Sequence, residues 1–390
     1  MIIKSLLSQD LYKYTMLQVF FNDFPGATAK YRFKCRNDVV DLRPFKEEIE
    51  EELDALCGLK HTTDELDWLA SQRFFFEPFI NYLEDYTLKR RYITVTETKE
   101  SLDICMEGPI TGTSPFEIFV LKIVHEVYTR NVNPPTDSLL FAGKQVLRNK
   151  IIDFEDFVND NGFKPTVIDF GGRRAYTTEW HEYVVRNLAQ RGVIVGTSDM
   201  DLARRLNIKA IGTFAHEFVQ TFQGLNICPV MESQSEAFQC WADFYRGDLG
   251  IALSDTLGDK KFLIDFDPYF AKLFDGVRHD SGDPFVWGDM MITHYKAFNI
   301  EPMTKTLVFS DGLDFPKMFE LAKYFNGKIK VSFGIGTNLS NDLGVDALQN
   351  VIKQVQCQGN PTAKLSNNIN KTMCEDEDYK NYLIGRLNQL

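Results

Sequence analysis

The chain has 390 residues and a formal net charge of −12, from 43 lysine and arginine against 55 aspartate and glutamate residues. Its 44% hydrophobic and 25% charged residues are ordinary for globular proteins and argue against a disordered, collagen-like or disulfide-scaffold chain. No apolar run reaches the ~18 residues of a membrane span, and an acidic chain is a poor binder of nucleic acid. The seven cysteines are scattered without a C-x-x-C pair, which predicts free thiols in a reducing cytoplasm and no zinc cluster.

Up to about residue 130 the chain predicts a mixture of helices and strands. Residues 27–35 alternate apolar and basic side chains, as a half-buried strand does. Ser8 and Asp10, residue types that cap helices, precede an amphipathic stretch. In chain order we expect a helix at 11–20, a strand at 27–35, helices at 47–59 and 63–71, strands at 92–98 and 102–106, and a helix at 118–129.

Beyond residue 165, short apolar runs recur, each ending in small or polar residues and each followed by a helical stretch. They lie at 166–172, 192–198, 210–213, 250–255, 276–280, 306–311 and 330–337. Most are spaced like strand–helix units, and runs without alternation are typical of strands buried on both faces. The seven runs predict an irregular parallel α/β barrel, opened by the uneven spacings of 16 and 42 residues on either side of Thr213. A doubly wound sheet would give similar runs.

The last part of the chain predicts a strand at 351–357, a short stretch at 363–366 and an Asn-rich surface loop at 367–370. We expect these elements to pair with the N-terminal region. The expected domains are therefore an N-terminal α/β (α+β) domain, residues 1–135 completed by 345–390, and a barrel domain, residues 136–344, that carries the active site.

Side chains that follow parallel strands meet at one edge of the sheet, where such folds carry their chemistry. Two late strands are followed by glycine turns with hydroxyl groups: Ser310, Asp311 and Gly312 after one, Gly336 and Thr337 after the next. Backbone amides at such turns bind phosphate. A single turn of this kind is more often structural, but two on neighbouring late strands favour a phosphate site.

Cations and carboxylates gather at other strand ends. Arg173 and Arg174 follow two glycines where a helix is expected to begin; cations there oppose the helix dipole, which favours a role in binding pyrophosphate or a carboxylate. In the stretch from Arg278 to Pro284, Asp280 and Asp283 suit ribose hydroxyls or a phosphate-borne Mg²⁺. Helix capping is an equal alternative for Asp283.

His216 lies just past a predicted strand, in Gly212-Thr213-Phe214-Ala215-His216-Glu217, so we expect it to face the pocket of the barrel. Its imidazole suits a general base, a phosphate ligand or a nucleophile. Glu217 is adjacent in sequence and points elsewhere on a helix, so a different carboxylate must orient the ring. The remaining histidines outside the 276–284 stretch are predicted to be structural or on the surface.

Taken in order and spacing, these stretches resemble the bacterial type of nicotinate phosphoribosyltransferase over nearly the whole chain. The matching stretches are Asp10-Leu11-Tyr12-Lys13 with Met16, Asp169-Phe170-Gly171-Gly172-Arg173-Arg174, Gly196-Thr197-Ser198, and residues 212–217, 276–284, 307–311 and 332–337. The resemblance implies a type II phosphoribosyltransferase architecture: an irregular α/β barrel and an α/β domain built from both chain ends. It also implies a ligase-type reaction of NAD salvage, in which nicotinate and phosphoribosyl pyrophosphate give nicotinate mononucleotide and pyrophosphate while ATP is hydrolysed.

The resemblance further implies the roles of individual residues. His216, Arg278 and Asp280 form the expected catalytic set, with His216 phosphorylated by ATP, Arg278 on the nicotinate carboxylate, and Asp280 on the ribose hydroxyls. Tyr12, from this or a neighbouring subunit, would stack on the pyridine ring, and Arg174 would steady pyrophosphate or the ring carboxylate. The other expected substrate-binding residues are Thr213, Ser310, Asp311, Gly312, Gly336 and Thr337. Of these, Gly312, Gly336 and Thr337 would hold the 5′-phosphate. Asp280 and Asp283 are the candidate residues for Mg²⁺.

Two alternatives stay open. A nicotinamide phosphoribosyltransferase would share the fold but accept a neutral amide, and a non-catalytic barrel that binds phosphate ligands would share the phosphate turns. An aldolase-type barrel is disfavoured because no lysine ends any of the seven predicted strands. The expected partners are nicotinate, phosphoribosyl pyrophosphate and ATP, with Mg²⁺ as cofactor, no nucleic acid and no membrane; a homodimer is left open.

Overall fold

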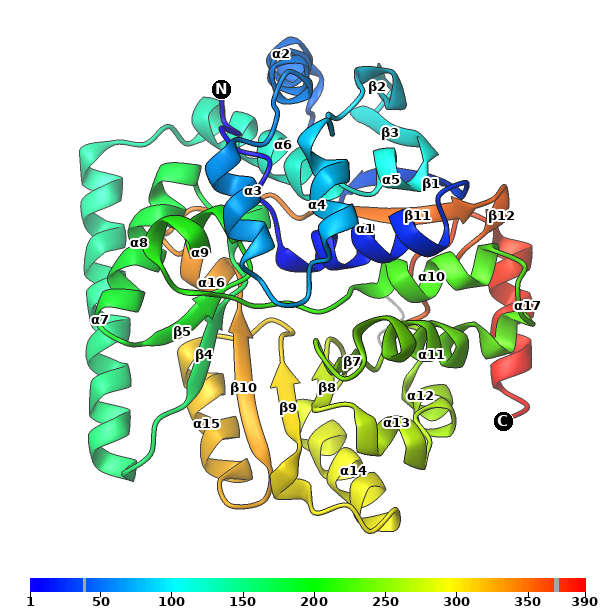
Figure 1. Cartoon of the computed structure of the whole chain (residues 1–390). Helices are drawn as coiled ribbons and strands as arrows, with labels where there is room; N and C mark the ends of the chain where they lie inside the picture. The colour runs from blue at the N-terminus through cyan, green and yellow to red at the C-terminus, as the bar shows by residue number, and fades with distance from the viewer. Residues whose placement is uncertain (38–39, 368–371) are drawn as a thin grey trace.

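The computed structural model describes residues 1–37, 40–367 and 372–390 and contains two sheets with helices packed around them (Figure 1). Residues 368–370 of the predicted Asn-rich loop lie outside the described residues. The strands are β1 Thr28–Cys35, β2 Ile93–Glu97, β3 Leu102–Pro109, β4 Thr166–Asp169, β5 Ile194–Thr197, β6 Lys209–Ala210, β7 Ile251–Leu253, β8 Gly276–His279, β9 Thr306–Phe309, β10 Lys330–Ile335, β11 Asn350–Cys357 and β12 Asn360–Pro361. The helices are α1 Leu11–Asp23, α2 Lys46–Cys57, α3 Thr63–Ala70, α4 Glu77–Glu84, α5 Ile110–Thr113, α6 Phe116–Val132, α7 Asp137–Asn161, α8 Thr178–Gln190, α9 Met200–Leu206, α10 His216–Gly224, α11 Ser233–Tyr245, α12 Asp259–Asp265, α13 Pro268–Leu273, α14 Pro284–Ala297, α15 Phe315–Phe325, α16 Thr337–Ser340 and α17 Glu377–Leu387.

The larger sheet is parallel, with the strand order β6-β5-β4-β10-β9-β8-β7. Its first strand, β4, pairs with its last, β10, so that Val167 lies opposite Phe333 and the sheet curls back on itself as a barrel does. Among the described strands no pairing joins β6 to β7, so the barrel is open there. This is the irregular parallel α/β barrel that the sequence predicts, and its opening falls between the two unevenly spaced runs.

The opening between β6 and β7 is bridged by a side chain. The hydroxyl of Thr213, just past β6, donates to the carbonyl oxygen of Ile251 in β7 at 2.8 Å. The chain between the two strands is long because it contains α10 and α11. A side-chain hydrogen bond therefore replaces the backbone pairing that a closed barrel would have.

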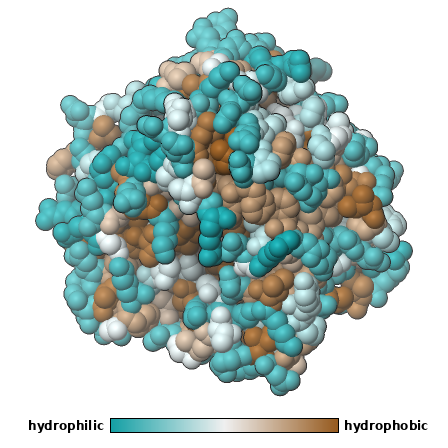
Figure 2. Space-filling model, viewed as in Figure 1, coloured by the Kyte–Doolittle hydropathy of each residue, from teal (hydrophilic) through white to brown (hydrophobic). Residues whose placement is uncertain are grey.

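The parallel strands are buried on both faces, which explains why their sequences do not alternate. Val167, Val277, Leu307 and Phe333 are completely buried. At Gly276 a Cβ atom would lie 2.0 Å from the carbonyl oxygen of Thr306, so only glycine fits between β8 and β9. On the outside, hydrophilic residues cover most of the face shown in Figure 2, interrupted by smaller hydrophobic areas.

The smaller sheet is antiparallel, with the order β12-β11-β1-β3-β2, and it joins the two ends of the chain. Ile352 of β11 lies opposite Phe33 of β1, so the strand predicted at 351–357 pairs with the N-terminal region as expected. The same expectation for residues 363–366 is wrong. The amide of Leu365 donates to the carbonyl oxygen of Thr256 at 2.9 Å, and this segment crosses the barrel end because the side chain of Lys364 pairs with barrel carboxylates.

Helix α1 attaches the N-terminal region to the carboxyl end of the barrel. Asp10, the residue before α1, forms an isolated β-bridge with Asp199, just past β5. The hydroxyl of Thr15 donates to the carbonyl oxygen of Thr213, just past β6, at 2.6 Å. Helix α1 therefore lies along the open side of the barrel, beside α10 (Figure 1).

All seven cysteines are free thiols, as predicted. Within residues 1–37, 40–367 and 372–390, no helix combines the length and the apolarity that crossing a bilayer would require.

Candidate active site

The candidate site lies where four neighbouring strands, β7 to β10, reach their carboxyl ends. Asp255, Asp280, Ser310 and Gly336 follow these strands in turn. His216 is the first residue of α10, which begins on the open side of the barrel. The fold therefore brings His216 and Asp280 together as predicted, and it adds Asp255 to them.

His216 is held by two carboxylates. Its Nε2 atom lies 2.7 Å from Oδ1 of Asp255 and 3.5 Å from Oδ2 of Asp280. His216 is 5% exposed and Asp255 is completely buried, so water is excluded from their contact. Oδ1 of Asp255 accepts a hydrogen bond from the Nε2–H group and fixes the orientation of the ring, which leaves Nδ1 with the lone pair.

The two carboxylates share one cation from the C-terminal segment. The Nζ atom of Lys364 lies 3.2 Å from Oδ2 of Asp255 and 3.2 Å from Oδ2 of Asp280, and the side chain is almost completely buried. Ser281 donates its hydroxyl to Asp255 at 2.8 Å. Buried like charges repel each other and are poorly solvated, so the shared ammonium is what allows both aspartates to stay ionised side by side.

Burial and these charges set the protonation states at neutral pH. Burial, together with the Lys364 ammonium, lowers the pKa of His216 to about 4 and outweighs the opposite effect of Asp255 and Asp280. Burial alone would raise the pKa of Asp280, but Lys364 is the largest of the charges that lower it to about 2. The imidazole is therefore neutral while both carboxylates are ionised.

Three further cations lie near this group: Arg173, Arg278 and Lys353. Among the described residues, none of their charged groups makes a hydrogen bond or salt bridge, and Nε of Arg278 is buried without an acceptor. Arg173 is exposed, and neighbouring groups raise its pKa, with Asp10 and Glu117 contributing more than Asp280. Burial lowers the pKa of Lys353 to about 8, and the charge of Lys364 acts in the same direction. These three cationic side chains, which we call the positive wall, are available to bind an anion.

The structure does not bring Arg174 to this wall. Its Nη2 atom donates to the carbonyl oxygen of Asn350 at 2.9 Å and its Nη1 atom to Oε1 of Gln349 at 3.0 Å, at the start of β11. Burial and the like charge of Arg173 lower the pKa of Arg174 to about 10. Of the arginine pair expected to bind an anion, Arg173 is the member whose charge couples to Asp280.

Two other predicted site residues are engaged by the fold. Oδ1 of Asp283 accepts hydrogen bonds from two amides in the first turn of α14, at 2.9 and 3.0 Å, so Asp283 has the capping role that was its alternative. Thr213 uses its hydroxyl to bridge the barrel opening and its carbonyl oxygen to accept from Thr15. Neither side chain is directed at His216 by these contacts.

The turn after β9 borders Asp280. The hydroxyl of Ser310 donates to the carbonyl oxygen of His279 at 2.9 Å and lies 3.4 Å from Oδ1 of Asp280. Gly312 has a φ of 58°, in the left-handed region that favours glycine. Asp311 is half-buried and Gly312 is exposed, so this turn is accessible from the carboxyl end of the barrel.

The turn after β10 offers free amides. Among the described residues, the amides of Gly336, Thr337 and Asn338 have no backbone acceptor, as the first amides of a helix never do within the helix itself. A Cβ atom at Gly336 would lie 3.3 Å from the carbonyl oxygen of Phe170, so the turn is tightly packed beneath. These donors match the need of a phosphate group.

Tyr12 of the same chain reaches the site from α1. A Cβ atom at Gly212 would lie 3.2 Å from the Tyr12 amide nitrogen, which shows how closely α1 approaches the segment before His216. The side chain is 8% exposed. Burial, and then the charge of Glu117, raise its pKa well above the usual value, while the charge of Arg173 lowers it. Tyr12 is therefore an uncharged ring beside the positive wall.

A metal ion fits this cluster poorly without a ligand to bring it. His216, Asp255 and Asp280 each offer one ligand atom within 4.8 Å of the others. Lys364 already pairs with both carboxylates, so a cation bound there would have to displace its ammonium. Because Mg²⁺ prefers six oxygen ligands and usually keeps several waters, the geometry favours Mg²⁺ that arrives on a phosphate group.

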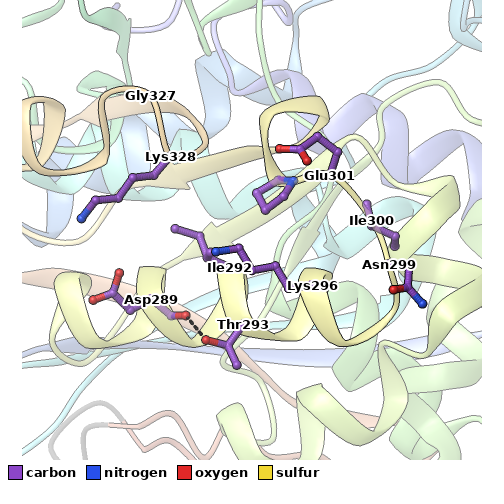
Figure 3. A pocket seen from close by; sticks show the side chains of 10 residues that line it. Asp289, Ile292, Thr293, Lys296, Asn299, Ile300, Glu301, Gly327 and Lys328 are labelled. Carbon is purple, nitrogen blue, oxygen red and sulfur yellow. Dashed lines mark hydrogen bonds between the residues drawn. The ribbon is translucent and has the colours of Figure 1, made fainter.

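A separate surface cavity of about 760 Å³ lies at the other end of the barrel (Figure 3). It is lined by α14 and by the segments before β9 and β10: Asp289, Ile292, Thr293, Lys296, Asn299, Ile300, Glu301, Pro302, Gly327 and Lys328. These segments sit at the amino ends of the strands. Since parallel barrels carry their chemistry at the carboxyl ends, we assign this cavity no catalytic role.

An open parallel barrel with a carboxylate-held histidine, unpaired cations and glycine turns at its carboxyl end is typical of enzymes that act on phosphate-bearing substrates. The chain belongs to the nicotinate phosphoribosyltransferase family: the family profile matches residues 166–389, and the profile of the family's N-terminal domain matches residues 7–125. A nicotinate phosphoribosyltransferase of Chromobacterium violaceum is 47% identical over 391 residues, covering 98% of this chain and 96% of that protein. One from Neisseria meningitidis serogroup B is 46% identical over 390 residues, with the same coverage. The crystal structure of a nicotinate phosphoribosyltransferase from Vibrio cholerae has a TM-score of 0.94 at 34% identity, covering 100% of this chain and 94% of that one.

Three residues of the site were not identified from the sequence: Asp255 as the partner of His216, and the lysines Lys353 and Lys364. Asp255 ends a predicted strand, so its position carried a signal, but not the identity of its partner. The two lysines follow no barrel strand. They reach the site because the chain returns to it after β11 begins, which no local pattern reveals.

Proposed function

We propose that the protein transfers the phosphoribosyl group of phosphoribosyl pyrophosphate to nicotinate, giving nicotinate mononucleotide and pyrophosphate, and couples this transfer to ATP hydrolysis through a phosphohistidine at His216. The observation that carries the proposal is the 2.7 Å contact of His216 with Asp255 in a buried site that also holds unpaired cations. Membership of the nicotinate phosphoribosyltransferase family supports it.

The first step is phosphorylation of His216. Its Nδ1 lone pair attacks the γ-phosphorus of ATP, a nitrogen–phosphorus bond forms, and the bond to the ADP oxygen breaks. Asp255 keeps the Nε2 proton and stabilises the positive charge that develops on the ring. A pKa of about 4 supports this role, because the ring keeps its nucleophilic form at neutral pH.

The second step is displacement at the anomeric carbon. The pyridine nitrogen of nicotinate forms a bond to this carbon while the bond to pyrophosphate breaks, through a state with oxocarbenium character. The protein forms no covalent bond in this step, so positioning of the substrates and neutralisation of the leaving-group charge provide most of the rate enhancement. Asp280 is placed to bind the ribose hydroxyls, and the amides of Gly312, Gly336 and Thr337 the 5′-phosphate.

The cations of the site bind different anionic groups of the substrates. The Arg278 guanidinium, whose Nε is buried without an acceptor, suits the planar nicotinate carboxylate. Tyr12 suits the pyridine face. Arg173 takes the pyrophosphate role first expected of Arg174. Asp280 would hold a Mg²⁺ ion that pyrophosphate brings, and the ion would supply charge neutralisation for the leaving group.

ATP coupling works only if the phosphorylated and free proteins differ in affinity, since a ligand shifts an equilibrium by its differential binding alone. A phosphoryl group on His216 would add negative charge within the electrostatic reach of Lys364, whose ammonium already acts on the ring and pairs with Asp255 and Asp280 at 3.2 Å. Phosphorylation therefore redirects this ammonium and changes the charge that Asp280 presents to the ribose.

The test combines product analysis with labelling. The protein is incubated with ATP labelled at the γ-phosphate, digested, and the acid-labile label is located by peptide; nicotinate mononucleotide and pyrophosphate are measured in parallel. We expect label on the peptide that contains His216 and none in His216→Ala, which keeps slow ATP-independent synthesis. Label elsewhere, or unchanged ATP coupling in the variant, would refute the phosphohistidine, and absence of pyrophosphate with all substrates present would favour the non-catalytic barrel.

Nicotinamide is the second candidate acceptor. The unpaired Arg278 guanidinium favours the acid, because a charge-assisted hydrogen bond is worth roughly 1.5–3 kcal/mol. In competition assays we expect nicotinate to be consumed in preference to nicotinamide. Arg278→Gln should raise the KM for nicotinate and leave that for phosphoribosyl pyrophosphate nearly unchanged; a flat nicotinate KM would contradict the assignment.

A further inference from the structure

A second charged cluster lies directly behind the site, completely inside the protein. The Lys13 side chain is 0% exposed, and its Nζ atom pairs with Glu117 at 2.6 Å and with Glu217. The side chains of Glu117 and Glu217 are 8% and 6% exposed. Lys13, Glu117 and Glu217, which we call the Lys13 cluster, come from α1, α6 and α10.

Every charged group of the Lys13 cluster has an ion-pair partner within it. The Glu217 carboxylate accepts from Lys13, from the hydroxyl of Tyr31 at 3.0 Å and from the hydroxyl of Ser114. Burial lowers the pKa of Lys13, but Glu117 and Glu217 raise it by more, so the ammonium stays charged. Apolar side chains of similar volume would hold three helices together as well as a buried ion pair does, so stability alone does not account for this arrangement.

The Lys13 cluster connects the helices that carry Tyr12 and His216. Lys13 follows Tyr12 in α1, and its Nζ atom lies 5.8 Å from the centre of the Tyr12 ring. Glu217 follows His216 in α10. Two further contacts tie the same surfaces together: the hydroxyl of Thr15 donates to the carbonyl oxygen of Thr213 at 2.6 Å, and the Ala215 amide lies 3.4 Å from Sδ of Met16.

Strand pairing does not fix how α1 and α10 lie against each other. The sheet has no pairing between β6 and β7 among the described strands, so on that side the segment that leads to His216 is held by the side-chain bond of Thr213 to Ile251 and by α1. Helix α1 is the element that covers this side. We propose that Lys13 is a positioning residue, which locks α1 to α10 through Glu217 and thereby holds the Tyr12 ring and His216 at the spacing that the reaction requires. This inference rests on the proposed function of Tyr12 and His216.

The test removes the link between α1 and α10 and keeps the net charge of the Lys13 cluster. Lys13→Met combined with Glu217→Gln changes the cluster from one cation and two anions to one anion, so its net charge stays at −1. The matched control is Lys261→Met with Asp265→Asn, which removes an equally buried pair within α12, with side chains 7% and 5% exposed. For each protein, kcat, the KM of each substrate and the thermal unfolding midpoint are measured.

We expect the Lys13→Met/Glu217→Gln protein to unfold cooperatively and to lose at least ten-fold in kcat, with a KM for phosphoribosyl pyrophosphate within two-fold of wild type. The control pair should keep kcat within two-fold. A folded double variant with wild-type kcat and nicotinate KM would overturn the positioning role. If that variant does not fold, Thr15→Val decides. It removes the hydroxyl that bonds to Thr213 and, within α1, to the carbonyl oxygens of Leu11 and Tyr12. We expect a loss of at least three-fold in kcat, whereas wild-type kinetics would overturn the proposal.

Failure of the proposed function has a different signature. It appears in the wild-type protein, as absence of nicotinate mononucleotide, and would overturn both proposals together. Failure of the positioning role alone appears only in the comparison of folded variants with an active wild-type protein.

Discussion

Nε2 of His216 lies 2.7 Å from Oδ1 of Asp255, and this contact decides which ring nitrogen can react. A carboxylate that accepts a hydrogen bond from Nε2–H selects one tautomer and leaves the lone pair on Nδ1. Lys364, which pairs with the same carboxylate, acts on the ring through its charge, which adds to burial in lowering the pKa of the imidazole. Orientation and protonation of the histidine are thus set by two different neighbours, and they can be tested separately.

Asp255→Asn tests the orientation. An amide can turn its NH₂ group toward Nε2, which favours the tautomer with the proton on Nδ1 and removes the nucleophile. We expect the single-turnover rate of His216 phosphorylation to fall at least ~100-fold. Ser366→Ala is the control, since the Ser366 hydroxyl lies 3.2 Å from Oδ2 of Asp255 but does not touch the ring; its rate should stay within about three-fold. A wild-type rate in Asp255→Asn would exclude this tautomer as the reactive form.

Lys364→Met tests the protonation state. Burial and the Lys364 charge both lower the pKa of His216, so removal of Lys364 should raise this pKa from about 4 while burial continues to hold it below the ordinary value. The acid limb of the pH–rate profile for phosphorylation should therefore move upward by roughly one unit or more, while wild type stays active down to about pH 5. Lys317→Met, at the surface, should leave the limb in place. A limb at the same pH in Lys364→Met would show that Lys364 does not control the ring.

Arg173 and Arg174 are adjacent in sequence and give a matched pair. Arg173→Ala removes an unpaired cation of the site, and we expect the KM for phosphoribosyl pyrophosphate to rise by roughly ten-fold or more, the worth of one charge-assisted hydrogen bond. Arg174→Ala breaks the bonds to Asn350 and Gln349 instead, so it should cost about 1–2 kcal/mol of unfolding free energy with little change in KM. Steady-state kinetics and denaturant unfolding of both variants check this, and the reverse pattern would restore Arg174 to the site.

His125 predicts a pH dependence of stability. It is 1% exposed, and burial together with the charge of Arg174 lowers its pKa to about 4. The unfolded chain takes up this proton near pH 6.5 and the folded protein only near pH 4, so stability is full above pH 6.5 and falls as the pH drops toward 4, by up to ~1.4 kcal/mol per pH unit for one histidine. Buried His61 and His216, with similarly low pKa values, add to the slope.

His125→Gln should flatten this decline by about one third over the same pH range, as measured by denaturant unfolding at a series of pH values. The substitution also alters the contact between His125 and Asn341, so the slope against pH, and not the absolute stability, is the quantity to compare. An unchanged slope would mean that His125 is protonated equally in the folded and unfolded states.

Much of the barrel could be predicted because its strands are buried on both faces, and such strands have continuous apolar sequences. The opening could be predicted too, since the uneven spacings around Thr213 reflect the insertion of α10 and α11. Helix α7, Asp137–Asn161, was not predicted, although its buried residues Gly143, Leu147, Ile151, Phe154 and Phe157 recur at the spacing of one helical face. Continuous apolar runs reveal strands that are buried on both faces, whereas one apolar stripe on a largely exposed helix is visible only as a period of three to four residues.

The site was harder to predict where it depends on the direction of a side chain or on a distant segment that returns to the barrel. Gly172–Arg174 form a single 3₁₀ turn, not the start of a longer helix, so neighbouring arginines leave it toward different partners and the dipole argument could not separate them. Lys364 reaches Asp255 across more than 100 positions of sequence, a contact that only the complete fold creates. Residue type predicted the chemistry at each strand end, but the tertiary structure determines which of these residues lie together in one site.

The late position of Lys364 has a consequence for synthesis. A ribosome delivers α1, His216, Asp255 and Asp280 long before it delivers residue 364, so a nascent barrel holds two neighbouring aspartates without their common counter-ion. The candidate site is completed only when the segment behind β11 leaves the exit tunnel. A translation product that stops at residue 362 therefore lacks the common counter-ion of Asp255 and Asp280, which is also one of the groups that lower the pKa of His216.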